Sequence, residues 1–128
     1  MNEFEWDDFE NLILAKIVEG NDPLLGLLKD QINNIVNRER KTTGVGFFTK
    51  LEISMKSPIP SLLKGKDFVI SDVIVQMNGL ESGAGFNLFV TDGVLDTLEG
   101  YTFQESWPDI LQIIKIDYRD SERKFTWA

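Results

Sequence analysis

The stretch FVTDGVLDTLEGYTF, residues 89–103, places one carboxylate, Glu99, among apolar neighbours. A carboxylate in an apolar cleft has a raised pKa and can transfer protons or bind a cation. General acid–base catalysis normally needs a second group, and no second carboxylate with a recognisable spacing accompanies Glu99. The alternative is a structural carboxylate at the rim of a sheet, where it accepts backbone hydrogen bonds or pairs with a basic side chain such as Arg119.

The chain contains no histidine and no cysteine. This composition excludes Ser-His-Asp and Cys-His nucleophile systems, which need an imidazole base. It also excludes ordinary zinc sites, whose ligands are thiolates and imidazoles. The chemistry left open is that of carboxylates, Lys, Tyr, Ser and an oxygen-ligated hard metal.

Other motifs that carry chemistry are incomplete in this sequence. The glycines of GLESGAGF, residues 79–86, resemble a phosphate-binding loop only superficially, because no Lys-Ser or Lys-Thr follows and a strand comes next. Asp67 and Asp72 lack the EF-hand spacing, and Ser61 with Lys64 reads as a basic loop. We therefore predict no catalytic residues, no metal site and no cofactor.

Two amphipathic helices are expected at the start of the chain. The first spans residues 3–19, with an apolar stripe at i, i+3, i+4 and i+8 formed by Phe9, Leu12, Ile13 and Ile17. The second is expected to begin after Asp22, a preferred capping residue followed by Pro23, and to run to about Asn37. Its predicted buried residues are Leu25, Leu28, Ile32, Ile35 and Val36, and Arg38, Arg40 and Lys41 would follow its C-terminus.

The apolar period then changes from 3.6 to 2, which indicates strands. The predicted strands are 47–55, 68–77, 86–91, 94–103 and 110–118; segment 68–77 is apolar on both sides, so we expect it to lie centrally in the sheet. Helices followed by strands predict an α+β domain, in which the N-terminal helical pair packs on one face of an antiparallel sheet of about five strands. The length of 128 residues fits a single domain over 1–128, and Phe125 and Trp127 are expected to dock the polar tail.

The dipeptide Asp92–Gly93 is typical of a two-residue type I′ hairpin turn. Such a turn predicts a regular register, in which Thr91 faces Val94, Val90 faces Leu95, Leu88 faces Thr97 and Phe86 faces Glu99. The face that carries Glu99 and Tyr101 is the more apolar one, so we predict that it is the core side.

The net charge is −8 and the pI about 4.5. Residues 67–114 contain no Lys or Arg but eight carboxylates, so this segment accounts for the whole net charge. An acidic chain is a poor candidate for binding nucleic acid or an anionic membrane, and it favours a basic partner. Aromatic residues beside carboxylates suit recognition of a basic protein surface. The predicted anchors are Glu99, Tyr101, Glu105 and Trp107, with Asp92 and Asp96 steering association; the alternative is a solvated acidic face that maintains solubility.

The first ten residues, MNEFEWDDFE, are acidic and lack the basic region of a signal peptide. The longest apolar runs are far shorter than the ~20 residues of a membrane-spanning helix. We therefore expect a cytoplasmic protein with no membrane partner.

The segment GAGFNLFVTDGVLDTLEGYTFQESWP, residues 83–108, resembles a signature found in small uncharacterised bacterial proteins. Its pattern is GxGF, then DGxLxxLEGY, then WP. Some of these proteins are similar to immunity proteins of bacterial toxin systems, which are small, acidic, cytoplasmic α/β domains. The resemblance implies a bacterial source and a non-enzymatic role, and it supplies no catalytic residues.

Three functions follow as hypotheses. The first is a non-enzymatic acidic protein that recognises a basic protein partner, as an immunity-type inhibitor of a bacterial toxin would. The second is a small-molecule pocket or an enzyme between the helices and the sheet that uses Glu99 and Tyr101. The third is a structural module that forms a homodimer through an exposed strand such as 47–55.

Overall fold

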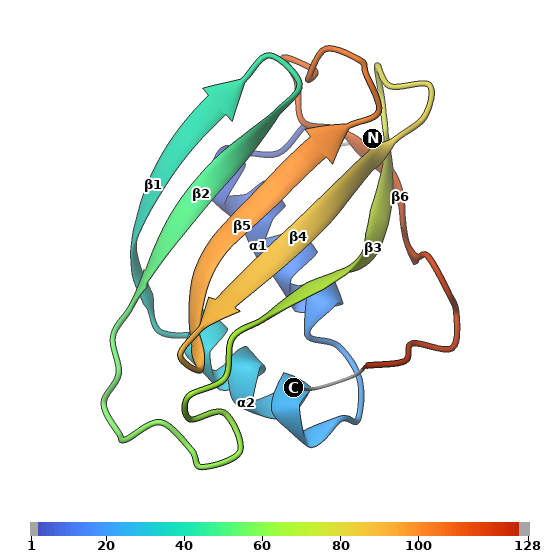
Figure 1. The fold of residues 1–128 in the computed structure, drawn as a ribbon. Helices are drawn as coiled ribbons and strands as arrows, with labels where there is room; N and C mark the ends of the chain where they lie inside the picture. Colours follow the sequence, from blue (N-terminus) through green and yellow to red (C-terminus); the bar gives the residue numbers. More distant parts are fainter. Residues whose placement is uncertain (1–2, 126–128) are drawn as a thin grey trace.

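The fold is described by a computed structural model over residues 3–125 (Figure 1). Two helices come first and six strands follow. Among the described residues, neither helix combines the length and the apolar character needed to cross a bilayer. The elements are α1 (Trp6–Ile17), α2 (Pro23–Ile32), β1 (Ile35–Thr43), β2 (Gly46–Ile53), β3 (Phe68–Met77), β4 (Ala84–Thr91), β5 (Val94–Thr102) and β6 (Ile113–Tyr118).

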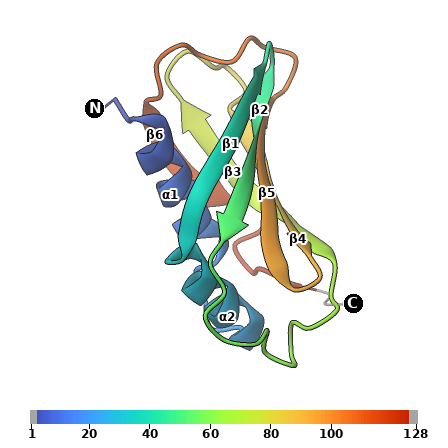
Figure 2. The same cartoon turned by 90° about the vertical axis from the view of Figure 1, so that its left-hand side faces the viewer.

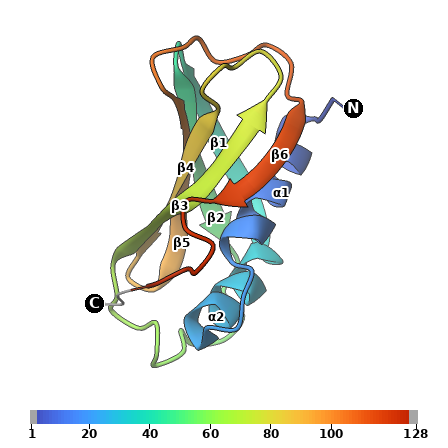
Figure 3. The same cartoon turned by 90° about the vertical axis from the view of Figure 1, so that its right-hand side faces the viewer.

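The six strands form one antiparallel sheet in the order β1-β2-β5-β4-β3-β6. Both helices lie on the same face of this sheet, as the two side views show (Figures 2 and 3). The predicted α+β class, with an N-terminal helical pair on one face of an antiparallel sheet, is therefore confirmed. The sheet has six strands where about five were expected.

The additional strand is β1, in a region that was predicted to continue the second helix. The helix ends at Ile32, and the Asn34 side chain donates a 2.8 Å hydrogen bond to the carbonyl of Asp30, where helical bonding stops. The next residues, Ile35 and Val36, are β-branched and favour a strand. Strand β1 covers one side of β2, so segment 46–53 lies inside the sheet and the predicted exposed edge at 47–55 is wrong.

The core lies between the helices and the sheet and is centred on five aromatic rings. Phe9 of α1 is fully buried, and its ring centroid lies 6.0 Å from that of Phe86 in β4. The predicted stripe of α1 is buried except for Leu12, which is 40% exposed. Burying one large apolar side chain contributes about 1.5–3 kcal/mol to stability. The rings of this aromatic cluster belong to Trp6, Phe9, Phe47, Phe86 and Trp107.

The segment after β6 is held against the end of α1 by Arg123. Its guanidinium makes two bonds of 2.6 and 2.9 Å to the carboxylate of Asp72 and donates to the carbonyls of Ile17 and Glu19. It also stacks on the ring of Tyr118, with 4.0 Å from Cζ to the centroid. Phe125 packs against the core, as expected for the tail, whereas Trp127 lies outside the described residues.

Candidate functional site

The β4–β5 hairpin begins as the sequence predicts. The pairs Thr91–Val94 and Val90–Leu95 are present. Asp92 and Gly93 both have positive φ, 53° and 78°, as a type I′ turn requires. The predicted turn and its first two residue pairs are confirmed.

Beyond these pairs the register differs from the prediction because β5 carries one extra residue. Phe89 lies opposite Thr97, and Asp96 has no opposing residue in β4. The Asp96 carboxylate accepts hydrogen bonds from the hydroxyls of Thr91 and Thr97, at 2.7 and 3.1 Å, which stabilises the bulge. Since side chains alternate between faces, one inserted residue exchanges the faces of all that follow. The predicted pairs Leu88–Thr97 and Phe86–Glu99 are therefore wrong: Leu88 faces Leu98, and Phe86 faces Gly100.

Glu99 consequently lies on the face of the sheet that the helices leave uncovered. Its neighbours in the ladder are Asn87 of β4 and Phe48 of β2. Asn87 Nδ2 donates a 2.9 Å hydrogen bond to the half-buried Glu99 carboxylate. The prediction that Glu99 faces the core is wrong, and Glu99 cannot line a pocket between helices and sheet.

Tyr101 lies on the same uncovered face, two residues further along β5. Its hydroxyl accepts a 2.7 Å hydrogen bond from Arg119, and its ring makes an edge contact of 5.7 Å with Phe103. The ring crosses Gly85 so closely that a Cβ atom there would lie 2.5 Å from Tyr101 Cζ and Oη. Glycine at this position is what allows Tyr101 to lie flat over β4.

We call the exposed apolar side of the sheet, together with Glu99 and Tyr101, the open face. Figure 1 looks onto it, with α1 behind the sheet. Val69 of β3 and Phe89 of β4 are cross-strand neighbours and are 42% and 36% exposed. Phe48 and Phe103 are each 43% exposed. The open face consists of Phe48, Val69, Phe89, Glu99, Tyr101 and Phe103.

The other four predicted anchors lie elsewhere. Asp92 and Asp96 are at the turn end of the hairpin. Glu105 follows the opposite end of β5, where its carboxylate accepts hydrogen bonds from the amides of Glu81 and Ser82 at 2.9 and 3.0 Å. These backbone bonds lower the pKa of Glu105. The six predicted anchors therefore do not form one surface.

Trp107 belongs to the aromatic cluster of the core. Its ring centroid lies 5.2 Å from that of Phe47, and it stacks on Trp6 at 6.3 Å. The indole Nε1 is buried without a hydrogen-bond partner among the described residues. The half-buried Trp107 thus packs with the rings beneath the sheet, away from the open face.

A buried ionic cluster, which we call the Glu10 cluster, was not foreseen from the sequence. Glu10 of α1 is fully buried, and its carboxylate accepts hydrogen bonds of 2.9 Å from Nη1 of Arg38 and 2.9 Å from Nε of Arg40. The hydroxyl of Thr49 also donates to it. Arg40 reaches Asp7 at 2.8 Å, and the hydrogen bond to Glu10 raises the pKa of Arg40. The signal in the sequence was the pair of arginines two residues apart, which places both on one face of a strand.

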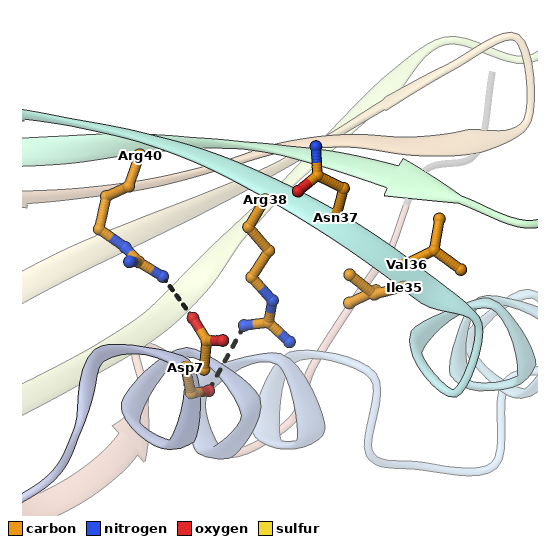
Figure 4. Close-up of a pocket in the computed structure, with 6 residues that line it drawn as sticks. All are labelled: Asp7, Ile35, Val36, Asn37, Arg38 and Arg40. Carbon is orange, nitrogen blue, oxygen red and sulfur yellow. Dashed lines mark hydrogen bonds and ion pairs between the residues drawn. The ribbon is translucent and has the colours of Figure 1, made fainter.

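The Glu10 cluster borders an open hollow of about 460 Å³ between α1 and β1 (Figure 4). Its charged lining groups are Asp7, Arg38 and Arg40. Figure 4 shows both guanidinium groups turned toward α1, where they are bonded to Asp7 or to its carbonyl. Because these charges are already compensated, the arrangement fixes β1 to α1 and offers no free charge for a ligand.

Within residues 3–125, no group of three or more carboxylates is placed to hold a metal ion. Comparison of the chain with protein-family models, with curated proteins and with solved structures finds no match.

Proposed function

We propose that this protein is a non-enzymatic acidic binding protein that takes a basic protein partner on its open face. The observation that carries the proposal is the one-sided cover of the sheet: helices lie on one face, and exposed aromatic side chains lie on the other. The face combines apolar area with a carboxylate, Glu99, held in place by Asn87.

The apolar part of the open face has the composition of an interface centre. Phe48, Phe89 and Phe103 are each between 36% and 43% exposed, although large side chains of this kind are usually buried. Exposed apolar patches on soluble proteins commonly mark interaction sites, and here the polar residues Glu99, Asn87 and Thr97 lie between Phe48 and Phe89 in the ladder. Aromatic residues also supply most of the strong anchors in protein interfaces.

The charge distribution supports a basic partner. Strands β4 and β5, at the centre of the sheet, lie in segment 67–114, which has eight carboxylates and no Lys or Arg. One cation shares the open side of the sheet with this centre: Lys50 of β2 lies opposite Thr97, two residues from Phe48 and on the same face. A net charge of −8 attracts a cationic protein over a distance and accelerates encounter at low salt.

We propose that the basic partner is a toxin and that this protein inhibits it. Support comes from the resemblance of residues 83–108 to bacterial proteins similar to toxin immunity proteins, and from the acidity of the chain. An immunity protein needs only to bind and block its toxin, which is consistent with a surface that has anchors but no paired catalytic groups.

The test is a binding titration, measured by calorimetry, of this protein with purified basic proteins that are encoded beside its gene. We expect Phe89→Ser and Glu99→Lys each to weaken the complex about tenfold or more, as loss of an interface anchor does. The matched controls are Leu12→Ser and Asp30→Lys, which make the same kinds of change at exposed helix positions and should leave affinity unchanged. If none of the neighbouring basic proteins binds, or if the open-face variants bind as tightly as the controls, the proposal is wrong.

A further inference from the structure

Among the residues that the structure describes, strand β1 is hydrogen-bonded on one side only. It pairs with β2 and forms one end of the strand order. Figure 2 looks onto its free edge, and no other segment within residues 3–125 crosses in front of it. The free edge presents unpaired backbone N–H and C=O groups, which can accept another strand.

The charges of β1 divide into two sets by face. Arg38 and Arg40 point inward, and both are paired with Glu10. Glu39 and Lys41 point outward, are exposed, and have no ion pair within residues 3–125. The edge therefore carries two opposite charges on the same face, two residues apart; Glu39 lies opposite Lys50 of β2 in the ladder without forming an ion pair with it, and Lys41 lies opposite Phe48.

We propose that β1 pairs antiparallel with β1 of a second copy of this chain, with the two-fold axis at Arg40. Glu39 of each copy then lies opposite Lys41 of the other, so two complementary pairs form on the outward side. Opposite charges across an antiparallel pair stabilise it, and like charges destabilise it. The axis is perpendicular to the sheet, and the two six-stranded sheets become one continuous sheet.

Charge and shape both select this register. An axis at Glu39 would place that carboxylate against its own copy, and an axis at Lys41 would place two ammonium groups together. With the axis at Arg40, the ladder runs from Asn37 to Thr43, and the next pair places Val36 opposite Gly44. Val36 is 58% exposed in the single chain, and Val45, which follows Gly44 in the turn, is 49% exposed, so apolar side chains lie near both ends of the ladder.

The two copies of Arg40 at the axis do not oppose this pairing. Each guanidinium is turned into its own chain, where it bonds to Glu10 and Asp7 and lies over the ring of Trp6 at 4.9 Å. Its charge is compensated before a second copy arrives. The Glu10 cluster thereby also holds the edge strand in a fixed position, which reduces the entropy lost on pairing. Glu39 and Lys41 lie on the same side of the sheet as the open face, since Lys41 is opposite Phe48 in the ladder; pairing uses only the edge of β1 and needs no partner on the open face.

A charge-swap series tests the proposal by sedimentation equilibrium over a wide range of protein concentration. We expect the wild-type chain to dimerise and Lys41→Glu to weaken the dimer about tenfold or more, because two attractive pairs become repulsive. The double variant Glu39→Lys with Lys41→Glu restores complementary pairs and should recover the wild-type constant. The control is Lys124→Glu, an equal change of charge in the exposed tail segment beyond β6.

The register is tested by cross-linking, since the chain has no cysteine of its own. Asn37 of one copy lies opposite Thr43 of the other, and paired Cα atoms about 4.5–5.5 Å apart permit a disulfide. The double variant Asn37→Cys with Thr43→Cys should form a covalent dimer on oxidation, and neither single variant should. A chain that is monomeric throughout and does not cross-link overturns the proposal, as does a dimer that neither the charge swap nor the cysteine pair affects.

Discussion

Glu10 Oε1 accepts a 2.9 Å hydrogen bond from Nη1 of Arg38, which joins two residues 28 positions apart in the sequence. The bond crosses from α1 to β1 and lies at the edge of the helix–sheet interface. Glu10 has no exposed surface, and the Arg38 side chain is only 14% exposed. A charge pair this well buried determines how the first helix and the edge strand fit together.

Replacing Glu10 by alanine should therefore destabilise the protein strongly. The change leaves two guanidinium groups without their buried counter-charge, which typically costs about 3–5 kcal/mol in the free energy of unfolding. Asp7→Ala is the control: its side chain is 67% exposed, and losing such an ion pair costs less than about 1 kcal/mol. Urea unfolding measures both, and equal losses would contradict the role given to Glu10.

The Arg123 contacts predict a second local effect on stability. Arg123→Ala removes a two-bond ion pair with Asp72, whose side chains are 10% and 24% exposed, and two hydrogen bonds to carbonyls at the end of α1. We expect a loss of about 1.5–3 kcal/mol, because the hydrogen bonds are made by a charged group. Lys124→Ala, at the exposed neighbouring position, should change stability by less than about 0.5 kcal/mol in the same urea measurement.

Tyr118 should make stability depend on pH in the alkaline range. Burial raises the pKa of Tyr118 to about 12, against about 10 in an unfolded chain. The folded state therefore keeps a proton that the unfolded state has lost, so stability is intact below about pH 10 and falls as the pH rises toward 12. Tyr118→Phe should flatten this part of the curve. An unchanged slope in thermal unfolding between these pH values would argue against the raised pKa.

Gly85→Ala should displace Tyr101 on the open face. The new Cβ atom would overlap the tyrosine ring at 2.5 Å, and overpacking of this kind typically costs about 1–3 kcal/mol. In a Tyr101→Ser background the same change should be nearly neutral, because the obstacle is gone. A double-mutant cycle by urea unfolding measures this coupling, and additive effects of the two changes would refute the close approach.

Trp107 should behave as a core residue. Trp107→Ala leaves a cavity inside the aromatic cluster and should cost about 3–5 kcal/mol. Trp107→Phe should cost much less, since it keeps an aromatic ring and removes the buried Nε1 that has no partner among residues 3–125. Thermal unfolding compares the two, and a mild effect of the alanine variant would place Trp107 outside the core.

Features that depend only on neighbouring residues could be predicted from the sequence. Asp22 caps α2 by accepting a 2.9 Å hydrogen bond from the amide of Leu24, and Pro23 begins the helix, as local chemistry predicts. Asp92 and Gly93 form the turn because both adopt the positive φ that a type I′ turn requires. The α+β class could also be predicted, because the spacing of apolar residues, 3.6 in a helix and 2 in a strand, can be read within each segment alone.

The directions in which Glu99 and Tyr101 point could not be predicted, because they depend on long-range packing. A single bulge residue, Asp96, turns Glu99 and Tyr101 from the core side to the open face, and no short pattern in the sequence announces it. Strand β1 forms where a helix was predicted, and its extended backbone beside α1 places Arg38 and Arg40 on one face, where both bond to the buried Glu10. Both outcomes depend on partners far along the chain, and their contact energies outweigh local preferences.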